Sequence, residues 1–318
     1  MADTEALRTA SLEPLRLWFI TDGRLGHLNQ LKGLAERLSA KRECDVRWLN
    51  ITLKGFKKTG RDGLLRQFGS NDLPDAVFAA GSRCHIPLLW AGWICRAKTV
   101  VLMKPSWPLS WFSAAIVPTH DAPPSRDNVL PTQGVLNAIV PHREGRDAHR
   151  GLILLGGLNK HFHWHSDDII EQIVSLAQAR PEVHWQVSDS PRSPQTLLPD
   201  LARRNLENVQ VMPFGHSGGG WLQGQLAEAG QVWVSRDSVS MVYESISSAA
   251  PTGLLHLQAA RDSRVTRSMQ QVVEAGLAVA WESHDAAQPL PNMSQPLWEA
   301  DRAADWLLAN LLRRQPND

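Results

Sequence analysis

Short apolar runs alternate with longer amphipathic stretches along almost the whole chain. Leu15–Thr21 is the first apolar run, and residues 27–41 follow it with apolar positions at helical spacing. The alternation restarts after a polar stretch, Pro141–Arg150, which has no apolar periodicity and is the best linker candidate. Strands that alternate with helices pair in parallel through right-handed crossovers. The pattern therefore predicts an α/β protein with two doubly wound, Rossmann-like domains.

The expected elements of each half follow from the same pattern. In the first half we expect strands at 15–21, 46–51, 75–80, 99–103, 114–117 and 128–130, with helices at 27–41 and 84–96. In the second half, expected strands at 152–155, 183–188, 209–212, 232–235 and 253–257 alternate with helices at 167–179, 196–204, 221–228, 238–249 and 265–275, and a last helix is expected at 297–313. Ligands in this architecture bind beyond the carboxyl ends of strands, which points to the loops there and to a cleft between the two domains.

The bulk composition fits two ordinary domains. A chain of 318 residues exceeds the usual size of a single hydrophobic core. Its 43% hydrophobic and 20% charged residues are typical of a globular protein. The formal net charge of +1 gives no electrostatic case for nucleic acid as the main partner, because duplex-binding proteins usually carry a basic surface.

The sequence favours a cytoplasmic location. Its first residues carry acids and lack the apolar core of a signal peptide. The three cysteines, Cys44, Cys84 and Cys95, show no CxxC pair and suit a reducing compartment. No run approaches the ~20 apolar residues that span a bilayer. We expect a cytoplasmic protein, with peripheral attachment at the inner face of the membrane as the alternative.

Tryptophan is frequent, with 13 Trp against one Tyr. Four of the tryptophans lie between Trp90 and Trp111, the other two being Trp93 and Trp107. A tryptophan-rich core is the favoured interpretation of this Trp90–Trp111 region. The alternative is a membrane contact near Lys104, because indole prefers the boundary between apolar and wet surroundings.

The loop after the first strand is the first candidate site. It contains Asp22, Gly23, Arg24, Gly26, His27 and Gln30. The two glycines allow a tight turn and close backbone approach, and the start of the following helix exposes free N–H groups. The spacing is not the G-x-G-x-x-G dinucleotide fingerprint. An imidazole here can accept a proton near neutral pH, so His27 is a candidate general base, and the alternative is a histidine that caps or packs.

The loop after the first strand of the second half is a second candidate. Gly156 and Gly157 suit close contact with phosphates, and Lys160 supplies a cation. His161, His163 and His165 alternate, so an extended chain would place them on one side, as in a metal site. No carboxylate or cysteine stands at a familiar ligand spacing, and we therefore expect no metal.

The segment from Val232 to Ser245 is the most informative. An apolar strand runs into Asp237 and Ser238 and then into a helix whose first residues include Ser240 and Met241. Free N–H groups there would form an anion site that the helix dipole favours. Glu244 lies one to two turns in, where it can accept hydrogen bonds from both hydroxyls of a ribose. An ordinary capped helix with a solvated glutamate is the alternative.

A further strand end carries an aromatic residue. Phe214 follows the strand expected at 209–212 and could lie against a nucleotide base. Three arginines after Leu257 are additional phosphate-side candidates, namely Arg261, Arg264 and Arg267.

Three motifs in order resemble those of the Elm family. They are T-D-G-R-x-G-H-x-x-Q from Thr21, G-G-x-x-K-H-F-x-W from Gly156 and R-D-S-V-S-M-V-x-E-S from Arg236. The family is named for a plant mitochondrial-fission factor, and its bacterial members look like glycosyltransferases. The resemblance covers about residues 15–315 and implies a GT-B fold, with the acceptor bound mainly by the first domain and the donor mainly by the second.

The resemblance also implies a domain plan and roles for individual residues. Residues 1–145 would form the acceptor-side domain, 146–300 the nucleotide-sugar domain, and 301–318 a helix that packs back on the first domain. The layout is more distantly similar to the N-acetylglucosaminyltransferase that makes lipid II. By position, His27 then matches the first-loop histidine of that enzyme type, Glu244 its ribose-binding glutamate and residues 238–241 its diphosphate-binding turn. Asp-Ser-Val-Ser stands where many GT-B enzymes have a glycine-rich turn.

We therefore expect a glycosyltransferase that needs no metal and no cofactor. It would move a sugar from a nucleoside-diphosphate-sugar to a glycan or lipid-linked acceptor, such as a cell-envelope glycan. Helix N-termini and cationic side chains would stabilise the departing diphosphate. The alternatives are a nucleotide-sugar epimerase of the same architecture and a non-catalytic Elm-type adaptor that keeps the fold.

Overall fold

Two parallel β-sheets of six strands each organise the part of the chain that the structure, a computed structural model, describes: residues 13–216, 220–292 and 297–313. The chain divides into two compact units. Unit 1 contains the described residues up to 117, then 124–130 and those from 300 onward. Unit 2 contains residues 118–123 and the described residues between 131 and 299. Residues 1–12, on which part of the location prediction rests, lie outside the described residues.

The sheet of unit 1 has the order β2-β1-β3-β4-β5-β6. Its strands are β1 (Leu15–Thr21), β2 (Cys44–Asn50), β3 (Ala76–Ala80), β4 (Lys98–Leu102), β5 (Ala114–Pro118) and β6 (Val129–Thr132). The helices of this unit are α1 (Leu25–Lys41), α2 (Arg61–Phe68), α3 (His85–Cys95) and α9 (Glu299–Asn310). Strand β3 is buried along its whole length, as expected of a central strand covered on both faces.

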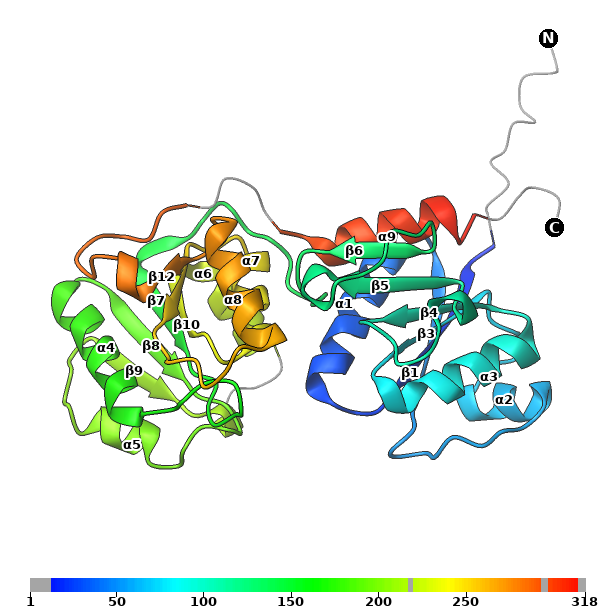
Figure 1. Cartoon of the computed structure of the whole chain (residues 1–318), viewed down its shortest axis with the longest axis horizontal. Coiled ribbons are helices and arrows are strands. Elements are labelled where there is room, and N and C mark those ends of the chain that lie inside the picture. Colours follow the sequence, from blue (N-terminus) through cyan, green and yellow to red (C-terminus); the bar gives the residue numbers. More distant parts are fainter. Residues whose placement is uncertain (1–12, 217–219, 293–296, 314–318) are drawn as a thin grey trace, which may run out of the picture. The chain divides into compact units, whose positions relative to one another are not determined.

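The sheet of unit 2 has the order β12-β11-β10-β7-β8-β9. Its strands are β7 (Asp147–Leu154), β8 (His184–Ser188), β9 (Val209–Met212), β10 (Ala229–Ser235), β11 (Thr252–Leu255) and β12 (Val279–Ala280). The helices are α4 (Ser166–Ala179), α5 (Leu197–Ala202), α6 (Trp221–Glu228), α7 (Val239–Ser247) and α8 (Arg264–Glu274). Figure 1 shows α4 and α5 together on one side of this sheet and α6, α7 and α8 on the other.

Short 3₁₀ turns complete the chain. They lie at Ser82–Cys84, Leu109–Trp111, Thr119–Asp121, Phe214–His216 and Trp281–Ser283. The predicted fold class, two doubly wound parallel sheets, is confirmed. Helix α2 and strand β12 were not predicted.

Glycines in two strands leave room for buried tryptophans on neighbouring strands. A Cβ at Gly151 would lie 2.2 Å from the ring of Trp185, and one at Gly253 would lie 2.5 Å from the ring of Trp233. Both tryptophans are almost completely buried. Because real Cβ atoms do not approach other atoms so closely, each glycine and tryptophan form one packing unit of the core of unit 2.

The Trp90–Trp111 region is not a tryptophan core. Trp93 is 71% exposed, Trp111 51% and Trp107 38%, while Trp90 is half-buried. The core prediction is therefore wrong for most of this region. Its inward-facing positions are filled instead by smaller side chains of α3, such as Leu88 and Ala91.

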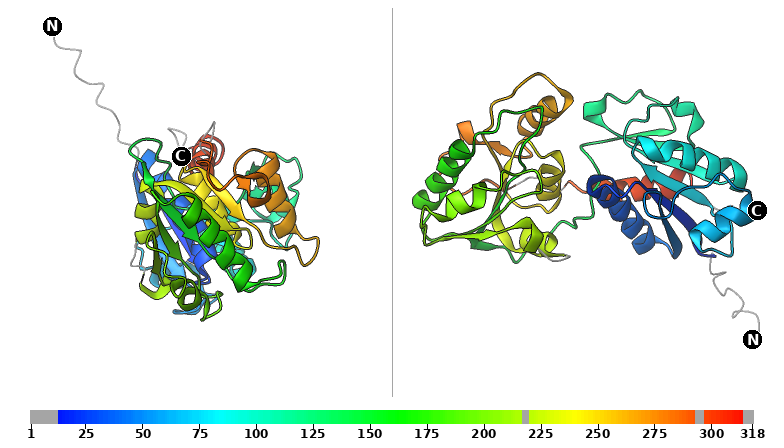
Figure 2. Two further views of the ribbon diagram at one scale, coloured as in Figure 1. Left: turned by 90° about the vertical axis from the view of Figure 1, so that its left-hand side faces the viewer. Right: turned by 90° about the horizontal axis from the view of Figure 1, so that it is seen from below.

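Helix α9 contributes to unit 1 although it follows unit 2 in the sequence. Asp301 accepts a hydrogen bond from Arg37 at 2.8 Å and from Lys41 at 3.0 Å, both residues of α1. The buried residues Ala303 and Leu307 face the same unit. Figures 1 and 2 show α9 (red) running along this sheet.

The stretch Pro141–Arg150 does not separate the two units. The guanidinium of Arg146 donates to the carbonyl oxygens of Leu226 and Ala229, each at 2.7 Å. Asn137 likewise donates to the carbonyl oxygen of Tyr243 at 3.3 Å. Residues 118–123 already belong to unit 2, and the chain returns to it at residues 130/131, earlier than the 145/146 boundary expected from the sequence. The polar side chains of Asn137 and Arg146 bind unit 2.

Candidate functional site

The loop after β1 holds a histidine against a buried carboxylate. His27 lies in the first turn of α1, and its Nδ1 is 2.9 Å from Oδ1 of Asp22. The Asp22 side chain is 1% exposed and the His27 side chain 17%. Burial alone would raise the pKa of Asp22, but the hydrogen bonds from His27 and from the Arg24 amide hold this pKa below its ordinary value.

The protonation of Asp22 determines the tautomer of its partner. An ionised carboxylate only accepts hydrogen bonds, so Nδ1 of His27 must carry the hydrogen. In the neutral imidazole this leaves the lone pair on Nε2, which is the arrangement of a histidine general base oriented by a carboxylate. The alternative of a helix-capping His27 has no support here, because its ring binds a side chain rather than the helix backbone.

A glycine at the end of β3 makes room for the His27 ring. A Cβ at Gly81 would lie 2.5 Å from the imidazole, and this residue has a φ of +89°. Gly81 is not among the residues predicted from the sequence. The one signal for it is its place directly after the buried strand β3, which pairs with β1, the strand that Asp22 follows.

The remaining residues of this loop shape it. Gly23 has a φ of +76°, which favours glycine, and turns the chain after Asp22. Gln30 is buried and donates to the carbonyl oxygen of Gly26 at 3.2 Å, so its amide belongs to the framework. Arg24 is exposed, with its Nε 3.7 Å from Asp22. The structure thus brings Asp22 and His27 together and leaves Arg24 at the surface.

In unit 2, Gly156 and Gly157 lie against the protein itself. A Cβ at Gly156 would lie 2.2 Å from Asp237, and one at Gly157 would lie 2.3 Å from the backbone of Arg192. The amide of Gly157 donates to Asp237 at 2.9 Å, and that of Gly156 to the Ser235 hydroxyl at 2.7 Å. This close packing leaves no room for a side chain at either position, which explains why both residues are glycine without invoking a ligand.

Asp237 is the centre of this loop network. Its side chain is completely buried and also accepts hydrogen bonds from the Ser235 hydroxyl at 2.6 Å and the Asn159 amide at 3.2 Å. Arg192 lies 3.4 Å away. Burial raises the pKa of Asp237, and these partners offset part of the increase. The network ties the loops that follow β7, β8 and β10 at the carboxyl edge of the sheet.

The other predicted residues of the second loop lie near α8. Lys160 is exposed. Nδ1 of His161 is 3.0 Å from the hydroxyl of Ser263, the N-cap residue of α8. Burial, with the nearby cations Arg261 and Lys160, lowers the pKa of His161, so the imidazole is neutral at pH 7.

Phe214, the predicted base-contacting residue, lies in the loop after β9. It is 41% exposed, and its backbone amide donates to the Asp189 carboxylate at 2.8 Å.

Helix α7 begins with amides that its own N-cap side chain does not bind. Ser238 is the N-cap and makes no side-chain cap hydrogen bond. The first amides of a helix have no acceptor within the helix, so those of residues 239–241 are available to an anion. Ser240 is exposed and Met241 half-buried.

Glu244 lies on α7 four residues after Ser240, so the two share a helix face. It is 6% exposed. The alternative of a solvated glutamate on an ordinary capped helix is therefore wrong. A carboxylate sheltered in this way, one turn from an exposed helix start, is suited to bind hydroxyl donors.

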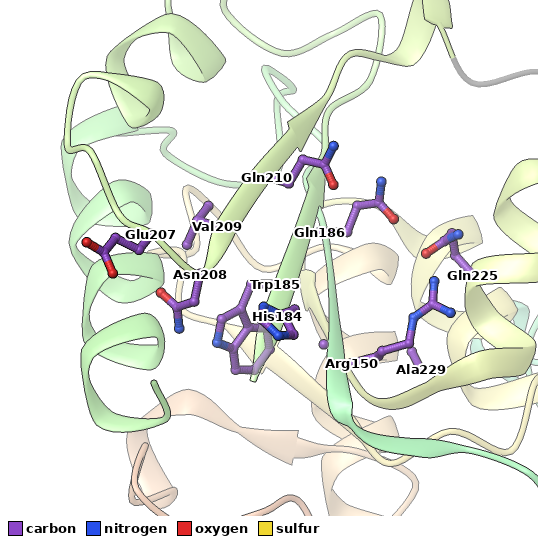
Figure 3. A pocket seen from close by; sticks show the side chains of 11 residues that line it. Arg150, His184, Trp185, Gln186, Glu207, Asn208, Val209, Gln210, Gln225 and Ala229 are labelled. Carbon is purple, nitrogen blue, oxygen red and sulfur yellow. The ribbon is translucent and has the colours of Figure 1, made fainter. Parts of the chain in front are cut away.

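Two cavities border the sheet of unit 2. The larger, ≈ 610 Å³, lies beyond the carboxyl ends of β10 and β11, with Phe162, Arg236, His256 and Met269 in its lining. The smaller, ≈ 390 Å³, lies at the starts of β7, β8 and β9, where Figure 3 shows Arg150, His184 and Gln210 around it. Because ligands of parallel sheets bind at the carboxyl ends, the smaller cavity is not the candidate site.

The alternating histidines of the second loop do not form a metal site with other side chains of the described residues. His161 is half-buried, whereas His163 and His165 are exposed. Within residues 13–216, 220–292 and 297–313, no group of three His, Cys, Asp or Glu side chains is arranged to hold a metal ion.

Comparisons with known proteins give one family and a set of similar folds. A family model described as mitochondrial fission ELM1 matches residues 25–311. No curated protein sequence matches the chain.

The similar folds come from solved structures of low sequence identity. The UDP-GlcNAc 2-epimerase from Methanocaldococcus jannaschii is 12% identical, with a TM-score of 0.56 over 93% of this chain and 100% of that chain. The UDP-GlcNAc 2-epimerase from Neisseria meningitidis, bound to UDP-GlcNAc, is 10% identical, with a TM-score of 0.56 over 94% of this chain and 100% of that one. The spinosyn forosaminyltransferase SpnP is 12% identical, with a TM-score of 0.51 over 93% of this chain and 94% of that one. These likenesses establish a fold of the GT-B type.

Proposed function

The chain belongs to the mitochondrial fission ELM1 family, and from that premise we propose that it is a glycosyltransferase. It moves a sugar from a nucleoside-diphosphate-sugar to a hydroxyl of a glycan or lipid-linked acceptor. The observation that carries the proposal is the Asp22–His27 pair, whose 2.9 Å hydrogen bond leaves Nε2 of a neutral imidazole as a proton acceptor.

The chemistry requires one proton transfer and one displacement. His27 Nε2 takes the proton of the acceptor hydroxyl, and the oxygen attacks the anomeric carbon. The bond from that carbon to the diphosphate oxygen breaks, and the nucleoside diphosphate leaves with the electron pair. One direct attack inverts the anomeric centre. Finding the retained configuration in the product would remove the role of His27 as the base.

The donor is assigned to unit 2. The free amides at residues 239–241 receive the diphosphate, aided by the dipole of α7, so that charge on the leaving group is stabilised without a metal. The buried Glu244 accepts hydrogen bonds from the ribose hydroxyls. Phe214, Lys160 and His161 lie on neighbouring loops of the same sheet edge, where they would contact the base, the phosphates or the sugar.

A thermal-shift screen with UDP-, GDP- and CMP-linked sugars tests the donor assignment. A ligand at 100 times its Kd stabilises the folded protein by about 2.7 kcal/mol, which corresponds to a shift of about 5 °C or more. Glu244→Gln should abolish the shift. The control Glu207→Gln changes an exposed glutamate beside the smaller cavity and should keep it.

Two outcomes would replace the proposal. A nucleotide-sugar epimerase is the second candidate, because the same Asp22–His27 pair can also remove a carbon-bound proton and two of the structures of similar fold are UDP-GlcNAc 2-epimerases. Incubation with donor alone separates the activities: an epimerised donor favours this candidate, and acceptor-dependent release of nucleotide favours transfer. Calorimetric titration in which no nucleotide-sugar binds would favour a non-catalytic adaptor.

A further inference from the structure

Unit 1 presents an apolar surface beyond its core. We name as the tryptophan surface the exposed Ile86 and Trp93 of α3 and the half-buried Trp90 beside them, together with Trp107 and Trp111 of the β4–β5 connection. Ile86 is 48% exposed, and Trp93 and Trp111 exceed half exposure. An apolar area of this kind on a monomer marks an interaction site.

Helix α3 lacks the polar face of an ordinary surface helix. Its sequence, HIPLLWAGWIC, contains no Lys, Arg, Asp or Glu. One side packs on the sheet through Leu88, Ala91 and Cys95, and the opposite side carries Ile86 and Trp93. A helix that is apolar all round is normally buried on all sides or in contact with lipid.

The two elements of the tryptophan surface cover the same face of the sheet. Leu88 of α3 and Phe112 of the β4–β5 connection belong to one core cluster, and the rings of His85 and Phe112 are 5.9 Å apart. The outward indoles also pair within each element, with ring centres 5.5 Å apart for Trp90–Trp93 and 5.1 Å apart for Trp107–Trp111. The exposed indoles therefore lie on one side of unit 1.

The segment that carries this surface has a surplus of positive charge. Residues 53–113 contain nine Lys and Arg against three Asp and Glu, a surplus of six, whereas the whole chain has a net charge of +1. All nine cations are exposed. Two of the three acids, Asp72 and Asp75, are paired with Arg16 of β1, outside this segment.

Two of these cations lie directly beside α3. The Lys58 ammonium is 5.8 Å from the centre of the Trp90 ring. Arg61 donates to the carbonyl oxygen of Ile94 at 3.0 Å. These two cations form a positive rim along the α3 side of the tryptophan surface.

We propose that the tryptophan surface docks on a membrane containing anionic phospholipids. Indole side chains are most stable at the boundary between headgroups and acyl chains, and exposed lysines and arginines are attracted by anionic headgroups. Binding at the membrane interface strengthens both with the apolar area that enters it and with the attraction to anionic lipids. In the described part of the chain no helix is long and apolar enough to cross a bilayer, so the contact is peripheral.

Other occupants fit the surface less well. A second copy of the same surface would bring two positive rims together, which is unfavourable. A single-stranded nucleic acid would use the cations and indoles but leave Ile86 and the uncharged side of α3 in water. The proposal does not rest on the transferase activity.

Vesicle co-sedimentation of the full chain tests the proposal without donor or acceptor. We expect at least tenfold stronger binding to phosphatidylcholine vesicles containing phosphatidylglycerol than to phosphatidylcholine alone, and a marked loss at high salt. The double variant Trp93→Ser with Trp111→Ser should weaken binding at least tenfold. Lys57→Glu with Lys58→Glu should remove the preference for anionic vesicles.

Val140→Ser is the matched control, because Val140 is a 42% exposed apolar residue of unit 2. It should bind vesicles as the wild type does. Circular dichroism and melting confirm that each variant is folded. Brominated lipids should quench tryptophan fluorescence in the wild type and not in the double tryptophan variant. The proposal is overturned if vesicle binding is absent, if it is equal in the double variant, or if the protein self-associates or binds oligonucleotides through this surface instead.

Discussion

At the first loop of unit 1, one carboxylate oxygen of Asp22 accepts hydrogen bonds from both the His27 ring and the Arg24 amide. These bonds keep the pKa of Asp22 below its ordinary value in spite of burial. The folded protein therefore binds fewer protons at this group than the unfolded chain. The resulting stabilisation is present at pH values above the ordinary pKa of 3.8 and is lost as the pH falls through the lowered value. At neutral pH Asp22 is ionised and fixes the tautomer of His27.

Substituting Asp22→Asn should remove the negative charge beside His27 while keeping the shape of the loop. A neutral amide stabilises the imidazolium that forms when His27 takes a proton less well than a carboxylate does. We expect kcat to fall by about 10²–10⁴ with little change in the KM for the donor. Steady-state kinetics of nucleotide release measures both constants.

A carboxylate outside the site provides the comparison. Asp72→Asn changes an exposed residue whose carboxylate lies 3.8 Å from the guanidinium of Arg16, and it should leave kcat unchanged. Full activity of Asp22→Asn would show that the Asp22 carboxylate does not orient the base.

At the scale of elements, the loops of unit 2 depend on Asp237. Asp237→Ala would leave the amide of Gly157, the hydroxyl of Ser235 and the side chain of Asn159 without their buried acceptor. We expect the free energy of unfolding to fall by about 2–4 kcal/mol. Urea denaturation monitored by circular dichroism gives the value.

Asp262→Ala is the matched change on the surface of the same unit. The Asp262 side chain is 73% exposed and forms an ion pair with Arg267, so its loss should cost less than about 1 kcal/mol. Equal losses for Asp237→Ala and Asp262→Ala would contradict the role given to the Asp237 network.

The long elements of the fold follow from sequence pattern, and two short ones do not. Strand β1 begins and ends as the apolar run predicts; α4 differs from expectation by one residue at its start, and α8 by one residue at each end. Helix α2, with Gly63 in its middle, and the two-residue β12 carry too little periodic signal to be recognised. Boundaries inside polar stretches also escape prediction, because Nη1 of Arg146 donates to carbonyl oxygens 80 and 83 residues away.

The sequence predicts which loops carry the candidate site residues, but not the contacts that those residues make. The motifs located His27 and Glu244 after the correct strands. The sequence does not reveal that Gly81 makes room for the imidazole, because the contact joins residues more than fifty positions apart. Nor does it distinguish the buried Trp185 and Trp233 from the exposed Trp93, since burial depends on a glycine in a neighbouring strand.

At the scale of the whole molecule, the two units have separate hydrophobic cores. Each core cluster draws its buried residues from one unit, with Trp18 and Val101 in unit 1 and Trp233 and Ile173 in unit 2. Domains with their own cores unfold as separate cooperative units when their coupling is weak. We therefore expect two transitions on heating.

Differential scanning calorimetry with a nucleoside diphosphate should move one transition only. The ligand stabilises the unit that binds it, so the transition lowered by Asp237→Ala should rise, by several degrees at 100 times the Kd. Leu307→Ala, which truncates a completely buried side chain of α9, should lower the other transition instead. A ligand that raised the transition sensitive to Leu307→Ala would place the nucleotide in unit 1.

The position of α9 after unit 2 in the sequence has a consequence for folding during synthesis. Domains usually fold in the order in which they leave the ribosome. Here the strands of unit 1 emerge first, but α9, whose Asp301 pairs with Arg37 and Lys41 of α1, is translated only after unit 2. Unit 2 can therefore fold before unit 1 is complete, and until α9 emerges the sheet of unit 1 lacks this helix.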